Sequence, residues 1–272
     1  MLLTRHKTKE GPRLALDGAY LPEHLTLQML LSLPLVNLYQ LLQTLPLGDR
    51  AVDPLLPPLE AAHEVWACGV TYLRSRQARE QEADLKDVYE KVYDAERPEL
   101  FFKSVGWRAA GHKMPIRIRR DSRWNVPEPE LTLVINSERE IIGYCAGNDV
   151  SSRDIEGANP LYLPQAKMYD GSCALGPGIL IEDGGWPADM SIQMNIVRGD
   201  EVIFQGETRS SQMKRSPGEL VDYLTREMKF PYGVFLMTGT GVVPDDNFTL
   251  LPGDLVQIRI GSLLLENKTV SS

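Results

Sequence analysis

The sequence has few of the residues on which disulfide frameworks and zinc sites depend, with 3 cysteines and 4 histidines among 272 residues. The cysteines are odd in number and far apart, unlike those of a disulfide-rich secreted protein: they are Cys68, Cys145 and Cys173. No histidine stands at metal-ligand spacing from a cysteine or from another histidine; the four are His6, His24, His63 and His112. We therefore expect a reduced, cytoplasmic protein without a structural zinc ion.

The sequence also lacks an apolar run long enough to cross a membrane. The most apolar stretch, Leu25 to Leu47, is interrupted by Pro34 and several amide side chains, so it predicts two amphipathic helices, over His24–Leu33 and Val36–Thr44. Met1 to Arg13 carries charge throughout, without the apolar segment of a signal peptide. The net charge of −8 argues against a nucleic-acid groove or an anionic membrane surface. We expect neither a nucleic acid nor a membrane as a partner.

Sequence motifs of several large enzyme classes are absent as well. The chain has no Gly-x-Ser-x-Gly nucleophile elbow, no Walker phosphate loop and no Gly-x-Gly-x-x-Gly after a strand. These absences argue against an α/β-hydrolase, a P-loop enzyme and a dinucleotide-binding enzyme.

The distribution of proline predicts where the chain divides. The stretch Asp53-Pro-Leu-Leu-Pro-Pro-Leu is a stiff linker, so we expect a small N-terminal domain with this linker over residues 1–58 and a catalytic domain over 59–272. Short alternating runs with Gly and Pro turns predict strands in the second part, with a charged helical segment from Thr71 to about Asp94 and a helix over Pro217–Met228. The predicted fold class is α+β but mostly β, a mixed β-sandwich or rolled sheet.

Three carboxylates point to a metal site. Glu128 and Glu130 stand two residues apart at the head of a strand-like run, so their side chains share one face. Asp149 ends a second apolar run, where a neighbouring strand would bring it alongside. Such a cluster without histidine or cysteine favours Mg²⁺, Mn²⁺ or Ca²⁺ over zinc. The alternative is a solvated edge strand, interrupted by Pro127 and Pro129.

The order of several short motifs resembles the fumarylacetoacetate hydrolase superfamily from Leu55 onward. The motifs are Glu128-Pro-Glu, Gly143-Tyr, Asn148-Asp-Val-Ser-Ser-Arg-Asp, Ala166-Lys-Met-Tyr-Asp, Leu175-Gly-Pro, Thr238-Gly-Thr-Gly-Val and Leu251-Pro-Gly-Asp. The resemblance implies a mixed β-roll, a divalent metal ion held by Glu128, Glu130 and Asp149, and a homodimer or higher homo-oligomer.

The resemblance also implies roles for residues near these carboxylates. Lys167 and Lys103 match active-site lysines, and Thr240 with Gly239 matches the loop that caps the substrate carboxylate. Arg153 would anchor the site electrostatically. Simpler alternatives are surface charges for the two lysines, a hairpin turn around Thr240, and an ion pair of Arg153 with Asp154 or Glu156.

One departure from the superfamily pattern bears on the reaction. Hydrolytic members carry His-x-x-Glu, whereas this chain has Gln77 and Glu80, and glutamine cannot take a proton from water near neutral pH. The stretch from Thr71 through Arg76 and the stretch from Asp87 to Lys103 are similar to the 2-keto-3-deoxy-D-arabinonate dehydratase branch. This similarity implies Thr71 and Arg76 as substrate-binding residues, and Glu99 as a proton carrier beside Lys167 unless it is a solvated strand end.

The expected substrate is therefore a small 2-oxo acid. Mg²⁺ takes about six oxygens, so three protein carboxylates leave room for the carboxylate and keto oxygens of such an acid. The implied reaction is loss of water from 2-keto-3-deoxy-D-arabinonate to give 2,5-dioxopentanoate in pentose catabolism. The alternatives are an acylpyruvate hydrolase or oxaloacetate decarboxylase on the same metal site, and an inactive metal-stabilised binding protein.

Overall fold

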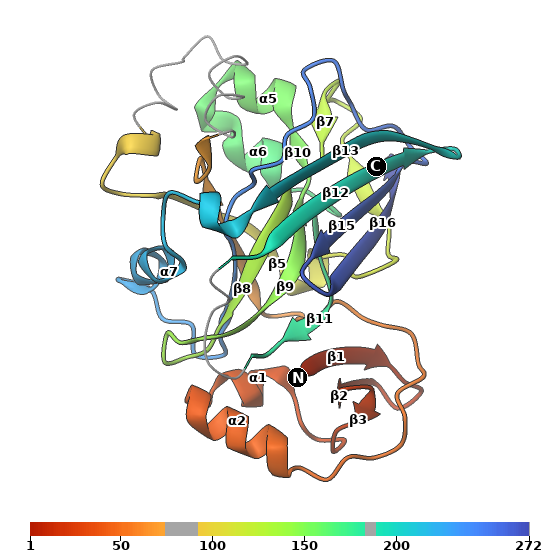
Figure 1. Ribbon diagram of the computed structural model, residues 1–272, viewed down its shortest axis with the longest axis vertical. Helices are drawn as coiled ribbons and strands as arrows, with labels where there is room; N and C mark the ends of the chain where they lie inside the picture. Colours follow the sequence, from red (N-terminus) through yellow and green to blue (C-terminus); the bar gives the residue numbers. More distant parts are fainter. Residues whose placement is uncertain (74–91, 183–188, 272) are drawn as a thin grey trace.

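A mixed nine-stranded sheet forms the centre of the molecule, as a computed structural model of residues 1–73, 92–182 and 189–271 shows (Figure 1). Its strands β8 and β9 pair antiparallel, and all seven residues of β8 are buried. Both faces are therefore covered, which explains why the sequence here is nearly continuously apolar rather than alternating. The order across the sheet is β3 (Ala19–Tyr20), β2 (Pro12–Leu16), β1 (Leu2–Lys7), β11 (Cys173–Leu180), β9 (Ile141–Asp149), β8 (Pro129–Ile135), β14 (Val234–Met237), β4 (Glu64–Gly69) and β5 (Glu99–Val105).

A second sheet of five strands packs over β8 and β9 (Figure 1). The core between the two sheets holds Leu131 and Ala146 from the first sheet, and Ile192, Met194 and Ile258 from the second. This packing confirms the predicted mostly β, layered architecture. The order of the second sheet is β13 (Glu201–Arg209), β12 (Ser191–Arg198), β15 (Leu255–Ile260), β16 (Leu263–Ser271) and β6 (Ile116–Ile118).

The N-terminal elements lie at one end of the large sheet, at the bottom of Figure 1. Strand β1 pairs antiparallel with β11, Leu3 opposite Ile179, and helices α1 (Leu27–Leu31) and α2 (Leu35–Thr44) lie in the regions predicted to be helical. The proline-rich linker runs beside β1, where the Leu56 amide donates to the Arg5 carbonyl at 2.8 Å. The division of the chain into domains at residue 58 stays a prediction.

Two short helices at the top of Figure 1 supply side chains that contact the predicted carboxylates. They are α5 (Arg153–Ala158) and α6 (Leu163–Lys167), with the two-stranded pair β7 (Asn125–Val126) and β10 (Ser151–Ser152) beside them. The sequence did not predict these two helices, nor strands β1, β6 and β16. Helix α7 (Pro217–Thr225) begins where predicted, with the Ser216 hydroxyl accepting from the Glu219 amide, and ends three residues early.

No helix in the described ranges is long and apolar enough to cross a membrane. The predicted helical segment between Thr71 and Asp94 falls mostly outside the described residues.

Candidate active site

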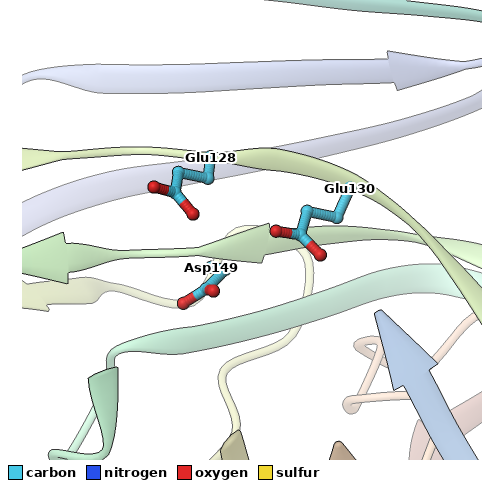
Figure 2. Close-up of side chains that lie close together, drawn as sticks. All are labelled: Glu128, Glu130 and Asp149. Atoms are coloured by element: carbon cyan, nitrogen blue, oxygen red, sulfur yellow. The ribbon is translucent and has the colours of Figure 1, made fainter. Parts of the chain in front are cut away.

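The three predicted metal ligands converge at one end of the β8–β9 ladder (Figure 2). The Asp149 amide donates to the Glu128 carbonyl at 2.9 Å, so this pairing places Asp149 opposite Glu128, while Glu130 lies two residues further along the same face. One carboxylate oxygen from each residue lies within 4.8 Å of the others, and the three residues are 1–2% exposed. The solvated edge-strand alternative is therefore wrong.

Glu130 is the carboxylate in this cluster that forms no ion pair with the cations of the described residues. Its Oε2 accepts the Gly239 amide at 2.7 Å, and Glu130 has no ion-pair partner in the described part of the chain. Burial raises its pKa well above the usual range, and the charges of Asp149 and Glu128 raise it further. A divalent cation would relieve this repulsion, so the donor set fits the oxygen-binding ions Mg²⁺, Mn²⁺ and Ca²⁺.

Two buried lysines hold the other two carboxylates. Lys167, the last residue of α6, donates from Nζ to Glu128 Oε2 at 2.7 Å, to Asp149 Oδ2 at 2.9 Å and to the Ser151 hydroxyl at 2.5 Å. Lys103 pairs with Asp149 Oδ1 and donates to the Lys167 carbonyl. Lys103 and Lys167 are 0% and 2% exposed, so the alternative of surface charges is wrong for both.

Arg153 fixes the remaining oxygen of Glu128. Its Nη2 donates to Glu128 Oε1 at 2.8 Å, and the side chain is buried at the start of α5. Asp154, by contrast, accepts from the Ser122 hydroxyl and the Arg123 amide. Arg153 therefore pairs with Glu128, and its role as an electrostatic anchor stays a prediction.

A small cavity of about 10 Å³ opens beside the carboxylates. Lys167 is the one cationic side chain among the described residues that line it. Glu99 and Glu156 add two further carboxylates, at the start of β5 and on α5. The full lining comprises Cys68, Gly69, Val70, Glu99, Phe101, Glu128, Glu130, Asp149, Glu156, Leu163, Lys167 and Thr240.

The glycine-rich loop after β14 closes one side of the cavity. Gly239 has φ +91°, and a Cβ there would lie 2.0 Å from Thr71 Oγ1, so this position requires glycine. The Thr71 hydroxyl donates to the Thr238 carbonyl at 2.6 Å and supports the loop from behind. Thr240 lines the cavity, and its hydroxyl donates to the Val242 carbonyl at 3.1 Å.

Val70, at the end of β4, is an unusual backbone position in the cavity wall. It has φ +51°, although it is β-branched. Such conformations cost on the order of 1–3 kcal/mol and concentrate at functional sites. Its place beside Gly69 and Glu99 fits that pattern.

The structure thus brings Glu128, Glu130, Asp149, Lys167, Glu99 and Thr240 together around one cavity. Lys103, Arg153 and Gly239 contact this group without lining the cavity. Thr71 does not line it either, and its hydroxyl contacts the Thr238 carbonyl. Arg76 and Gln77 lie outside the described residues. Two residues near the site, Glu156 and Ser151, were not predicted from the sequence. Ser151 lies within the motif Asn148-Asp-Val-Ser-Ser-Arg-Asp, whereas Glu156 stands in a charged stretch typical of a solvated helix.

Comparisons with known proteins identify the family of this chain. The family model described as fumarylacetoacetate hydrolase C-terminal matches residues 64–270. A "Probable 2-keto-3-deoxyxylonate dehydratase" of Haloferax volcanii is 50% identical over 200 residues, covering 73% of this chain and 69% of that protein. A "2-dehydro-3-deoxy-D-arabinonate dehydratase" of Saccharolobus solfataricus is 42% identical over 234 residues, covering 84% of this chain and 77% of the relative.

Two solved structures of dehydratases have a similar fold over the whole chain. The structure described as "2-keto-3-deoxy-D-arabinonate dehydratase complexed with magnesium and 2,5-dioxopentanoate" has a TM-score of 0.83 and 33% identity, covering 100% of this chain and 99% of the other. The apo form of a 2-keto-3-deoxy-D-arabinonate dehydratase has a TM-score of 0.85 at 33% identity, with the same coverage. The chain belongs to the fumarylacetoacetate hydrolase family.

Proposed function

We propose that this protein is a Mg²⁺-dependent dehydratase that removes water from a 2-keto-3-deoxy sugar acid, with 2-keto-3-deoxy-D-arabinonate as substrate and 2,5-dioxopentanoate as product. The observation that carries the proposal is Glu130, a buried carboxylate that has no ion-pair partner within residues 1–73, 92–182 and 189–271. It lies next to Glu128 and Asp149 at the wall of a cavity. Relatives at 42% and 50% identity that are named dehydratases of such acids support the substrate class.

Glu128, Glu130 and Asp149 would hold the ion. When bound, Mg²⁺ polarises the carbonyl of a chelated 2-oxo acid and so favours loss of a proton from C3. Mn²⁺ and Ca²⁺ are possible substitutes because they take the same oxygen ligands.

The residues around the metal ligands would bind the substrate, transfer a proton and orient the ligands. Lys167 offsets the negative charge that a bound 2-oxo acid adds beside Glu128 and Asp149. Thr240 and the neighbouring backbone of Gly239 bind the substrate carboxylate, and Glu99 accepts the C3 proton. Lys103 and Arg153 fix the orientations of Asp149 and Glu128 from behind.

The proposal also covers where the enzyme is located and how many copies assemble. Three buried free cysteines are compatible with a reducing compartment, and we place the enzyme in the cytoplasm, in pentose catabolism. We also propose a homodimer. Strand β13 is an edge strand with exposed side chains along most of its length, a surface that a second copy can cover.

The proposal is tested by incubating the purified protein with Mg²⁺ and 2-keto-3-deoxy-D-arabinonate and following the reaction by proton NMR. The expected result is that the C3 methylene signals of the sugar acid are replaced by those of an aldehyde. An unchanged spectrum with Mg²⁺ present contradicts the proposed activity.

A further inference from the structure

Strand β4 places its two smallest residues opposite two side chains of β5 that line the cavity. In the register of this antiparallel pair, Gly69 lies opposite Glu99 and Ala67 lies opposite Phe101. Residues two apart in a strand share a face, so Glu99 and Phe101 point to the same side, and both line the cavity. The small residues of β4 therefore leave room on this face for the side chains of β5.

The missing side chain of Gly69 lets Glu99 lie across β4. A Cβ atom added to Gly69 would lie 2.5 Å from Cδ of Glu99 and closer still to its Oε2, and its three nearest heavy atoms all belong to Glu99. Real Cβ atoms essentially never come within 3.0 Å of such atoms. A larger residue at position 69 would therefore force the carboxyl group of Glu99 to move.

Glu99 would otherwise occupy an ordinary strand end. It is the first residue of β5, which is the last strand on its side of the nine-stranded sheet. A glutamate at such a position usually extends into solvent. Glu99 is instead half-buried and lines the cavity, in the place that Gly69 leaves open. A glycine within a strand often marks such a close approach.

Resting on the proposed function, in which Glu99 accepts the C3 proton, we propose that Gly69 is a positioning residue for this reaction. Its missing side chain allows the Glu99 carboxyl group to lie against β4 at the cavity wall. Backbone conformation does not explain this glycine, because Gly69 does not have a positive φ. The role of Gly69 is therefore to leave space for a functional side chain.

Gly69 and Gly239 differ in what a substitution would displace. At Gly239 the added Cβ would meet Thr71, whose hydroxyl is held by the Thr238 carbonyl, and the positive φ adds strain. At Gly69 the added Cβ would meet the far end of the Glu99 side chain, which can rotate away at little cost. A substitution at position 239 should therefore lower stability, whereas one at position 69 should lower activity.

The test compares Gly69→Ala in the wild-type chain with Gly69→Ala in a Glu99→Gln background. Gly218→Ala is the control, because a Cβ added to Gly218 has nothing within 4 Å and its φ is not positive. Proton removal is followed by deuterium incorporation at C3 of 2-oxobutyrate with Mg²⁺, and dehydration is followed with the sugar acid. Mg²⁺ affinity and thermal unfolding are measured on the same samples.

Gly69→Ala should lower both the exchange rate and kcat on the sugar acid by about 10²-fold, the usual contribution of an acid–base group. Its Mg²⁺ affinity and Tm should stay close to those of the wild-type protein. In the Glu99→Gln background the same substitution should change either rate by no more than a fewfold, because the group that it displaces no longer accepts a proton. Gly218→Ala should match the wild-type enzyme.

Full activity of Gly69→Ala, equal losses in the two backgrounds, or a parallel loss of Mg²⁺ affinity would each overturn the proposal. A crystal structure of Gly69→Ala adds a measurement that does not depend on activity. It should show the Glu99 carboxyl group moved away from the cavity wall and the three metal ligands in place, and an unmoved carboxyl group is the contrary result. Wild-type protein that neither exchanges nor dehydrates would refute the proposed function, while the crystal structure would still decide whether Gly69 positions Glu99.

Discussion

The ammonium nitrogen of Lys167 lies 2.7 Å from Glu128 Oε2, although the two residues are far apart in the sequence. Glu128 directly precedes β8, and Lys167 is the last residue of α6. Both residues are almost fully buried, so each would be destabilising without the other. Lysine and arginine contacts therefore hold Glu128 and Asp149, whereas Glu130 has no ion-pair partner where the structure describes the chain.

Removal of the divalent ion should abolish activity. Exhaustive treatment with EDTA is expected to stop dehydration, and added Mg²⁺ or Mn²⁺ should restore it, because three of the ion's oxygens come from the protein. Glu128→Gln should weaken Mg²⁺ binding by calorimetry far more than it lowers the free energy of unfolding. Full activity of a chelated sample with no residual metal is the contrary result.

The stability of the metal-free protein should fall as the pH rises. The pKa of Glu130 is raised above its unfolded value, so the unfolded chain releases this proton first and the free energy of unfolding decreases up to the folded pKa. Bound Mg²⁺ removes this penalty. The difference in Tm between Mg²⁺-loaded and EDTA-treated samples should therefore widen with pH above about 4.3, the ordinary glutamate pKa.

Glu130→Gln is the control for this dependence, because an amide does not titrate. Its EDTA-treated form should lose less stability than the wild-type protein as the pH rises. A wild-type Tm difference that stays constant with pH would show that Glu130 is ionised in the metal-free fold.

Lys167→Ala should lower kcat by about 10²-fold or more while Mg²⁺ stays bound. The reason is that the variant leaves the substrate's negative charge without a cation in the described cavity wall. Steady-state kinetics with a parallel Mg²⁺ titration tests this, with the exposed Lys229→Ala as the matched control. An unchanged kcat would transfer the role to Lys103.

Gly239→Ala should destabilise the fold and disturb the metal site together. The new Cβ would meet Thr71 Oγ1 at 2.0 Å, and the Gly239 amide is the donor to Glu130. Gly253 offers a matched control, because it has a similar φ of +99° with nothing within 4 Å of an added Cβ.

Gly253→Ala should lower the free energy of unfolding by about 1–2 kcal/mol, the cost of a positive φ alone. Gly239→Ala should lower it further and weaken Mg²⁺ binding as well. Equal unfolding free energies for the two variants, measured in denaturant, would mean that the contact with Thr71 is easily relieved.

Local sequence patterns predicted the parts of the site that depend on neighbouring residues. Alternation in the strand placed Glu128 and Glu130 on one face, and the end of an apolar run placed Asp149 beside them. Ser216 and Pro217 predicted the start of α7 for the same reason, since capping is a local interaction.

Features that depend on distant pairing were not predictable in this way. Strand β1 joins the sheet through β11, far along the chain, and nothing within Leu2–Lys7 specifies that partner. Glu156 stands in a charged stretch that resembles a solvated helix, and its burial depends on how α5 packs over the cavity. Lys103 and Lys167 could be assigned to the site only through the family motifs, because a lone lysine in a sequence is usually exposed.

The ratio of kcat/KM for 2-keto-3-deoxy-D-arabinonate to kcat/KM for acetylpyruvate, measured on one Mg²⁺-loaded preparation, tests the central claim most directly. Aldehyde formation is followed by coupling to an aldehyde dehydrogenase, and cleavage by pyruvate release. Elimination needs no activated water, so the account predicts rapid aldehyde formation from the sugar acid and little or no pyruvate from acetylpyruvate. Rapid pyruvate release without aldehyde from the sugar acid would contradict it and identify a hydrolase of the same family.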